Sequence, residues 1–276
     1  MESGSKYYTI GDSFYREVAF FFNGTYSYKG RYTINGTYRY EGTNKMGKSR
    51  KARWLPTWNI SGAWNVHEEK FFSHVQPALS HLSLKASYSL TADRGPSYVT
   101  NSLAVIKAST PWRPTSGDPE PGLKVSSLEN AQLTYEKKHE LNLGLDVGFV
   151  NNRINLAFDW YKRNNFDLIG TVTTQGIGGE ISKYGNVAEM KSNGVEISLS
   201  TKNVQTKNFS WTTNFIYSHI HNEVTKLETS TRAMTLVSGT GFTMEGYPAR
   251  SPFSFQFAGL TSRTIRSWCG VFVLHK

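Results

Sequence analysis

Residues 140–162 read ELNLGLDVGFVNNRINLAFDWYK, and this stretch decides the fold. Large apolar side chains alternate with polar or very small residues on both sides of the pair Asn151-Asn152. Alternation with a period of two, interrupted by a turn signal, predicts a β-hairpin with one apolar and one polar face. Each arm has about 10 residues, the length with which a tilted strand crosses a bilayer. The predicted apolar face holds Leu141, Leu143, Leu145, Val147, Phe149, Ile154, Leu156, Phe158 and Trp160.

The same alternation recurs along most of the chain, and it predicts an all-β protein with eight strands. Besides the two arms of the hairpin, apolar faces are predicted within residues 20–28, 32–40, 58–66, 82–90, 195–199 and 209–217. The pattern also permits a ninth strand at 253–260.

The predicted connections fall into two length classes that alternate along the chain. The short class comprises residues 29–30, 67–80, 151–152 and 203–207, and within its longest member the stretch 67–76 is compatible with a short helix. The long class comprises residues 43–55, 92–138, 164–192 and 221–252. Short turns at one rim and long loops at the other are typical of outer-membrane β-barrels. The remaining alternative from the pattern is a soluble β-sandwich, whose strands alternate as well.

The composition agrees with a membrane barrel better than with an ordinary soluble enzyme. The 276 residues include 16 Phe, 15 Tyr and 7 Trp, yet the mean hydropathy is −0.45. No run approaches the roughly 18 apolar residues of a transmembrane helix. A barrel combines these properties because its polar inner face dilutes the average. Tyr and Trp near the strand ends, such as Tyr28, Tyr32, Trp54 and Trp58, predict the aromatic girdles of such barrels.

The formal net charge is +10, and the densest group of basic residues lies in the predicted loop 43–55. No zinc-finger, recognition-helix or RNA-binding motif accompanies this group, so nucleic acid is not expected as a partner. We expect either contact with the anionic sugars of lipopolysaccharide or a solvated loop. Cys269 is the single cysteine, which excludes a disulfide framework within the chain. The first residues lack the pattern of a signal peptide, so either the chain is an interior piece of an exported protein or the prediction of a membrane barrel is wrong.

Several runs of the sequence resemble a known family. They include YSYKGRYTINGTYRYEGTNKMG, WLPTWNISGAWNVHEEKFF and the stretch LTYEKKHELNLGLDVGFVNNRINLAFDWYKRNNFDLI, followed by the motif Asn193-Gly194-Val195-Glu196. From about Phe14 to Leu260 the chain resembles the C-terminal half of the barrel in SusC/RagA-type, TonB-linked outer-membrane transporters.

The resemblance implies a fold and a function. The fold is an antiparallel transmembrane β-barrel segment, in which the eight or nine strands form part of a barrel of about 22 strands. Residues 1–260 would be the partial barrel, and residues 261–276 an atypical tail of truncated or out-of-frame origin. The intact protein would lie in the cell outer membrane and import oligosaccharides or oligopeptides. Its expected partners are a SusD-like surface lipoprotein, TonB, and outer-membrane lipid or lipopolysaccharide.

The residues themselves suggest no enzyme. We predict no catalytic group, cofactor or metal site, because no set of His, Asp, Glu or Ser has the required spacing. His67, His74 and His81 recur every seven residues, but a solvated turn explains them better than a metal site. Aromatic residues in the long loops are candidates for stacking on cargo sugars. These candidates are Trp112, Arg113, Phe242 and Tyr247, with packing within the loops as the alternative for each.

Two other functions stay open at this point. One is a passive or structural outer-membrane barrel without a plug domain. The other is a soluble, secreted β-sandwich that binds glycans.

Overall fold

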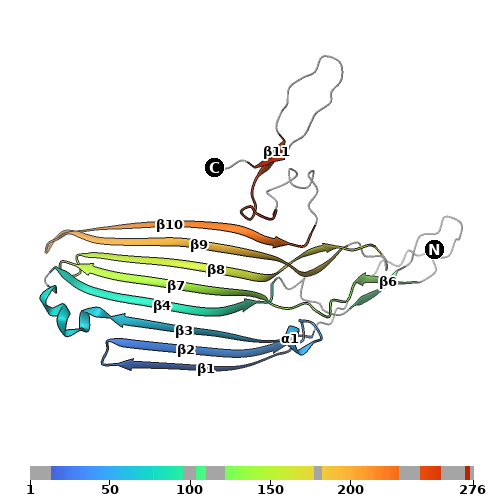
Figure 1. The fold of residues 1–276 in the computed structure, drawn as a ribbon, viewed down its shortest axis with the longest axis horizontal. Coiled ribbons are helices and arrows are strands. Elements are labelled where there is room, and N and C mark those ends of the chain that lie inside the picture. Colours follow the sequence, from blue (N-terminus) through green and yellow to red (C-terminus); the bar gives the residue numbers. More distant parts are fainter. Residues whose placement is uncertain are drawn as a thin grey trace, which may run out of the picture.

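The computed structural model describes residues 14–76, 78–95, 104–109, 122–176, 182–229, 243–255 and 271–273. Its main body is one antiparallel sheet with the strand order β1-β2-β3-β4-β7-β8-β9-β10 (Figure 1). The strands are β1 (Glu17–Tyr28), β2 (Tyr32–Thr43), β3 (Trp54–Asn65), β4 (Leu79–Asp93), β7 (Glu136–Phe149), β8 (Ile154–Thr173), β9 (Ser182–Gln205) and β10 (Ser210–Leu227). The eight predicted strands are therefore confirmed. In the described ranges no helix is long and apolar enough to cross a membrane.

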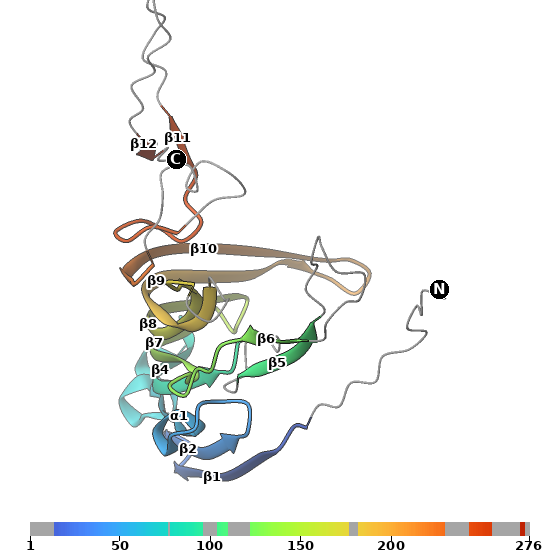
Figure 2. The ribbon, with the colours of Figure 1, turned by 90° about the vertical axis from the view of Figure 1, so that its right-hand side faces the viewer.

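The sheet is an open arc, and β1 and β10 form its two edges (Figure 2). A separate hairpin of β5 (Val105–Ser109) and β6 (Gly122–Ser127) is inserted between β4 and β7. The permitted ninth strand is realised only as β11 (Phe253–Phe255), which pairs with β12 (Val271–Val273) and does not join the main sheet. Residues 256–260 of that prediction lie outside the described part of the chain.

The hairpin of β7 and β8 forms as the alternation predicts. Leu143 pairs with Trp160 and Leu145 with Phe158, so that both arms turn their large apolar side chains to one face. The turn places Val150, Asn151 and Asn152 at positive φ, a conformation that Asn adopts more readily than most residues. It is closed by the Arg153 amide, which donates to the Phe149 carbonyl at 3.0 Å.

The register joins the apolar faces of all eight strands into one belt. One row across the sheet runs through Tyr26, Ile34, Gly62, Ala86, Leu143, Trp160, Val195 and His219. Large side chains in the belt stay accessible: Ile34 is 60% exposed and Leu143 is 44% exposed. A β-sandwich would bury such a face against a second sheet about 10 Å away. None of the described residues forms such a layer, so the sandwich alternative is wrong.

The two ends of the sheet differ as the connection lengths predict. The short-turn rim carries the connections 29–31, 66–78, 150–153 and 206–209, and the long-loop rim carries the others (Figure 1). The compatible short helix over 67–76 is present as two 3₁₀ helices, η1 (Val66–Glu68) and η2 (Lys70–His74). At the long-loop rim the chain forms one helical turn, α1 (Arg50–Arg53), whose N-terminus is capped by the Ser49 hydroxyl.

The predicted long loop at 164–192 is wrong. Strands β8 and β9 continue through this region, and Ile169 pairs with Asn186 and Thr171 with Tyr184. Only residues 174–181 connect the two strands. The ladder survives a bulge after Asn165, where Asp167 takes a φ of 57°. In the same way β10 extends to Leu227, beyond the predicted start of the last loop at residue 221.

A small core lies at the long-loop rim, where the chain has no alternation. Met46, Leu133 and Tyr135 are almost fully buried there, together with Leu55. The backbone reinforces the contact, because the Gly47 amide donates to the Leu133 carbonyl at 2.8 Å. This core fixes the loop after β2 against the segment that precedes β7.

Packing within the sheet explains why a glycine occupies position 194, in the motif Asn193-Gly194-Val195-Glu196. It pairs with Tyr161 across β8 and β9, and the Tyr161 ring lies over it. A Cβ atom at position 194 would come within 2.5 Å of the Tyr161 hydroxyl and within 2.8 Å of the His219 carbonyl oxygen. The Tyr161 ring is itself covered by the Arg163 guanidinium at 3.9 Å. An aromatic ring that covers a strand glycine is a known means of fixing register.

We therefore expect Gly194→Val to destabilise the sheet by about 1–3 kcal/mol through overpacking. The measurement is the urea midpoint of the barrel folded in lipid vesicles. Gly36→Val is the matched control, because a Cβ at Gly36 meets no atom within 4 Å. Equal midpoints for the two variants would contradict the proposed role of Tyr161.

Candidate functional site

The face opposite the apolar belt is polar, and it is hollowed in two places. The first, which we call the polar hollow, has a volume of about 370 Å³ and lies midway along the strands. Hydroxyl, amide and charged groups surround it. They belong to Thr25, Thr33, Asn35, Ser61, Lys85, Ser87, Asn142 and Asp159. Such groups can donate and accept hydrogen bonds toward the space that they enclose.

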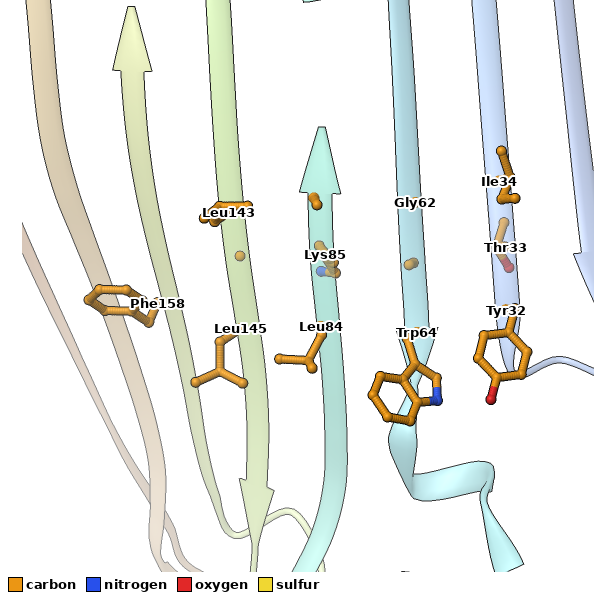
Figure 3. Close-up of a pocket in the computed structure, with 13 residues that line it drawn as sticks. Tyr32, Thr33, Ile34, Gly62, Trp64, Leu84, Lys85, Leu143, Leu145 and Phe158 are labelled. Carbon is orange, nitrogen blue, oxygen red and sulfur yellow. The ribbon is translucent and has the colours of Figure 1, made fainter. Parts of the chain in front are cut away.

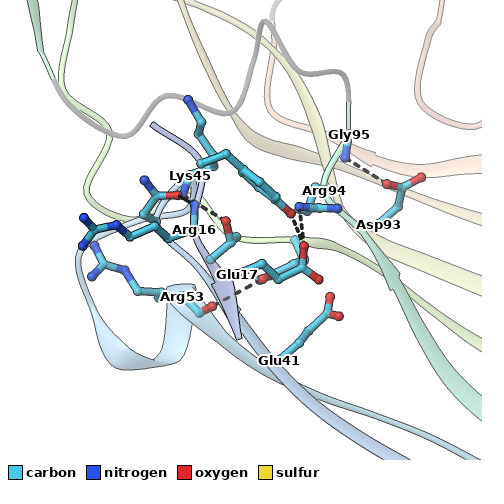
Figure 4. A network of polar contacts seen from close by, with 12 residues as sticks. Arg16, Glu17, Glu41, Lys45, Arg53, Asp93, Arg94 and Gly95 are labelled. Carbon is cyan, nitrogen blue, oxygen red and sulfur yellow. Dashed lines mark hydrogen bonds and ion pairs between the residues drawn. The ribbon is translucent and has the colours of Figure 1, made fainter. Parts of the chain in front are cut away.

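The second hollow, of about 330 Å³, lies on the same face at the long-loop rim. Five of its lining side chains are ionisable, and we call this set the rim cluster: Glu17, Arg39, Glu41, Asp93 and Arg94. Figure 4 shows Glu17 and Arg94 directed toward one another, and their charged groups are 3.1 Å apart. The Arg39 guanidinium lies 3.1 Å from Glu17 and 2.5 Å from Glu41.

The rim cluster contributes little to stability. Ion pairs between partly exposed groups are worth about 0.2–1 kcal/mol each, because solvent screens them. Tyr135 lies next to the cluster, and burial raises the pKa of its phenol to about 12. Its hydroxyl donates to the Arg53 carbonyl at 3.4 Å, so it stays neutral beside these charges. The cluster is thus a surface of mixed charge at the long-loop rim.

Further charges on the polar face are also paired across strands. Lys85 and Asp146 form an ion pair between β4 and β7. Glu140 accepts from Arg163 at 3.2 Å and lies 2.7 Å from the Lys138 ammonium. The pairs of Lys85 with Asp146 and of Arg163 with Glu140 cross neighbouring strands, so they stabilise the register of the wall as well as making its inner surface polar, whereas Lys138 and Glu140 both belong to β7.

Of the four loop residues predicted to contact cargo, only Tyr247 lies in the described part of the chain; Trp112, Arg113 and Phe242 lie outside it. The Tyr247 ring packs edge-on against Phe253, with ring centroids 5.7 Å apart. Its carbonyl accepts from the Val224 amide at 2.9 Å, which ties this segment to β10. Tyr247 therefore takes part in packing of the loop.

Of the three histidines that recur every seven residues, the described contacts bring together His67 and His81. The rings of His67 and His81 lie 4.1 Å apart, and His67 Nδ1 is 3.0 Å from the Leu82 carbonyl oxygen. Within the described ranges no three His, Cys, Asp or Glu side chains gather as a metal site.

Glu69, between η1 and η2, joins the short-turn rim to the sheet. Its carboxylate accepts from the Tyr32 hydroxyl at 2.6 Å and from the Trp64 indole N–H at 3.4 Å. The Arg31 guanidinium lies 3.3 Å away. The hydrogen bond from Tyr32 is the main reason that the pKa of Glu69 lies below its usual value of 4.5. The sequence of this connection carries no signal that would have shown this role of Glu69.

This lowered pKa predicts a pH dependence. The stabilisation is complete above the usual pKa of 4.5 and is lost as the pH falls through the lower pKa of the folded state. Acidification should therefore reduce the urea midpoint of the wild type more than that of Glu69→Gln. Glu68→Gln is the control, since Glu68 is exposed and should keep the wild-type pH profile. A pH profile of Glu69→Gln identical to the wild type would contradict this assignment.

An open antiparallel sheet with an exposed apolar belt outside and a hollowed polar face inside defines a segment of an outer-membrane β-barrel wall. The comparisons with known proteins identify the family. The family model described as "TonB dependent receptor-like, beta-barrel" matches residues 3–268, and the chain belongs to this family. Barrels of this family are outer-membrane receptors and transporters rather than enzymes.

Two relatives agree with this membership. The chain is 28% identical to TonB-dependent receptor P3 of Formosa agariphila over 210 residues. The aligned region covers 76% of this chain and 20% of the relative. It is 30% identical over 182 residues to TonB-dependent receptor SusC of Bacteroides thetaiotaomicron, covering 65% of this chain and 18% of the relative. The chain thus spans about a fifth of the length of the curated relatives it matches.

The fold is also similar to a solved structure. The structure of the RagAB peptide transporter superposes with a TM-score of 0.74 and 26% sequence identity, covering 91% of this chain and 27% of that chain. The SusC/RagA resemblance predicted from the sequence is confirmed.

Proposed function

We propose that this chain forms part of the wall, inner lining and outer loops of a TonB-dependent importer of oligosaccharides or oligopeptides. The observation that carries the proposal is the contrast between the two faces of one sheet. The outer face is an apolar belt, whereas the inner face carries the polar hollow and the rim cluster one after the other along the strands. A polar oligomer that enters at the long-loop rim would meet first charged groups and then hydroxyl and amide groups.

The open edges of the sheet support the view that other strands complete the barrel. Among the strands that the structure describes, β1 and β10 each have a neighbour on one side only, so each leaves a row of backbone groups for a further strand. In lipid, unpaired backbone groups are costly, which favours closure by strands from the remainder of a longer receptor. Residues 1–260 are the proposed barrel segment, and 261–276 the proposed atypical tail.

The proposed partners follow the same orientation. A SusD-like surface lipoprotein would cover the long-loop rim, and TonB would act from the opposite side. Lys48, Arg50 and Lys51 are exposed at the long-loop rim, where the sugars and phosphates of lipopolysaccharide would lie. We keep Trp112, Arg113, Phe242 and Tyr247 as proposed cargo contacts of the outer loops.

Uptake by the complete receptor tests the proposal. Cells that express it would be supplied with fluorescent oligosaccharides and oligopeptides of similar size, with and without TonB. We expect uptake of one class, lost without TonB and reduced by Ser87→Trp, which places an indole in the polar hollow. Tyr88→Trp is the matched control on the outer face. Uptake that persists without TonB would indicate a passive barrel, and uptake of neither cargo class would contradict the proposed substrates.

A further inference from the structure

The apolar belt has a hollow of its own on the outer face of the sheet, and we call it the apolar hollow. Its volume is about 650 Å³, within the range of about 300–1,000 Å³ typical of small-molecule sites. Figure 3 shows Tyr32 and Trp64 at one end, Leu84 in the middle, and Leu143, Leu145 and Phe158 at the other end. The hollow therefore runs across the strands from β2 to β8.

The hollow exists because two small residues meet at its centre. Gly62 and Ala86 are cross-strand partners, and they stand between Ile34 and Leu143 in the same row. A Cβ atom at Gly62 would meet only the Thr33 carbonyl oxygen, at 3.9 Å. Larger side chains on either side thus enclose a depression that a flexible apolar chain can fill.

The wall of the hollow nearest the short-turn rim is held in place. The rings of Tyr32 and Trp64 are stacked, with centroids 6.1 Å apart and planes 15° from parallel. Glu69 accepts a hydrogen bond from each ring, so both are fixed before any ligand arrives. Such preorganisation reduces the entropy that binding costs.

Positive charge lies beside this wall. The Arg31 guanidinium is matched by Glu69 at 3.3 Å. Lys29 and Lys70 are exposed, and among the residues that the structure describes neither ammonium has a carboxylate partner. Phe71, next to Lys70, is 61% exposed at the same rim. An exposed aromatic side chain beside a lysine is typical of a segment at the boundary between acyl chains and headgroups.

We propose that the apolar hollow binds one acyl chain of an anionic glycerophospholipid, whose phosphate lies between Lys29 and Lys70. The lipid belongs to the leaflet at the short-turn rim. The apolar lining selects a hydrocarbon chain, and the two unpaired ammonium groups favour a negatively charged headgroup over a zwitterionic one. This site is separate from the path of the cargo, which lies on the other face of the same strands.

The test uses the complete receptor, purified in mild detergent and examined by native mass spectrometry with added phosphatidylglycerol or phosphatidylcholine. We expect one phosphatidylglycerol to be retained by the wild type. Gly62→Phe should lower its affinity about tenfold by filling the hollow. Gly36→Phe, in the same belt but outside the hollow and with open space at its Cβ, should bind as the wild type does.

A second pair of variants tests the headgroup. Lys29→Gln with Lys70→Gln should remove the preference for phosphatidylglycerol over phosphatidylcholine while one lipid is still retained. Equal lipid retention by Gly62→Phe and the wild type would overturn the proposal. So would dimers that dissociate only in Gly62→Phe, because the hollow would then be an interface between two receptors. A receptor that imports its cargo but retains no lipid would contradict this inference alone.

Discussion

Leu145→Arg in the complete receptor should prevent most of the protein from assembling in lipid. Leu145 lies at the centre of the apolar run of β7, from Leu141 to Phe149. It faces outward with Leu84 and Phe158 as its neighbours on the adjacent strands. A charged side chain at the lipid face costs about 2–4 kcal/mol near the bilayer midplane. The measurement is the folded fraction in vesicles, from the change in gel mobility on heating and from urea titration.

The control must carry the same charge on the other face of the same strand. The alternation alone would offer Asp146→Arg, but the structure pairs Asp146 with Lys85, and an arginine there would meet a like charge. Asn142→Arg is the better control, because Asn142 faces the polar hollow between Ser87 and Tyr161. Equal folded fractions for Leu145→Arg and Asn142→Arg would mean that the apolar face is not turned toward hydrocarbon.

The sequence was sufficient to predict the strands of the wall and their two faces, because a bilayer constrains which side chains each face can carry. A strand that separates hydrocarbon from water must alternate, so residues such as Leu143 and Asn142 reveal their faces without any tertiary information. The ion pairs of the inner face follow almost as directly. Once the register sets Lys85 diagonally from Asp146 on the next strand, opposite charges are neighbours.

Alternation is required only of strand segments that face hydrocarbon, and the predicted strand ends and loops were wrong outside these segments. Beyond Asp167, strands β8 and β9 continue through Thr171 and Tyr184, where nothing requires an apolar face. Their ladder is held by backbone hydrogen bonds, which leave no pattern in the side chains. The prediction of a long loop over 164–192 therefore mistook strand without regular alternation for irregular chain.

The functional surfaces were equally hard to see in the sequence. Ser61, Ser87 and Asn142 are common polar residues, and only the strand register, which makes them cross-strand partners, brings them around one hollow. The rim cluster joins Glu17 to Arg94 across 77 positions, a separation over which the sequence holds no signal. The same is true of Glu69 and Tyr32, whose contact depends on how the connection 66–78 folds back.

Leu133→Ala should open the small core at the long-loop rim while the sheet stays folded. Leu133 is 1% exposed and packs with Met46 and Tyr135, so its truncation should cost about 2–5 kcal/mol of local stability. The Gly47 amide, bonded to the Leu133 carbonyl, reports the opening by faster hydrogen exchange. Leu123→Ala is the matched control, because Leu123 is 81% exposed and surface truncations change stability by about 0.5 kcal/mol or less. If Leu133→Ala left exchange at Gly47 unchanged, the outer loops would be held by something other than this core, and the rim cluster that it supports would have to be fixed from the sheet alone.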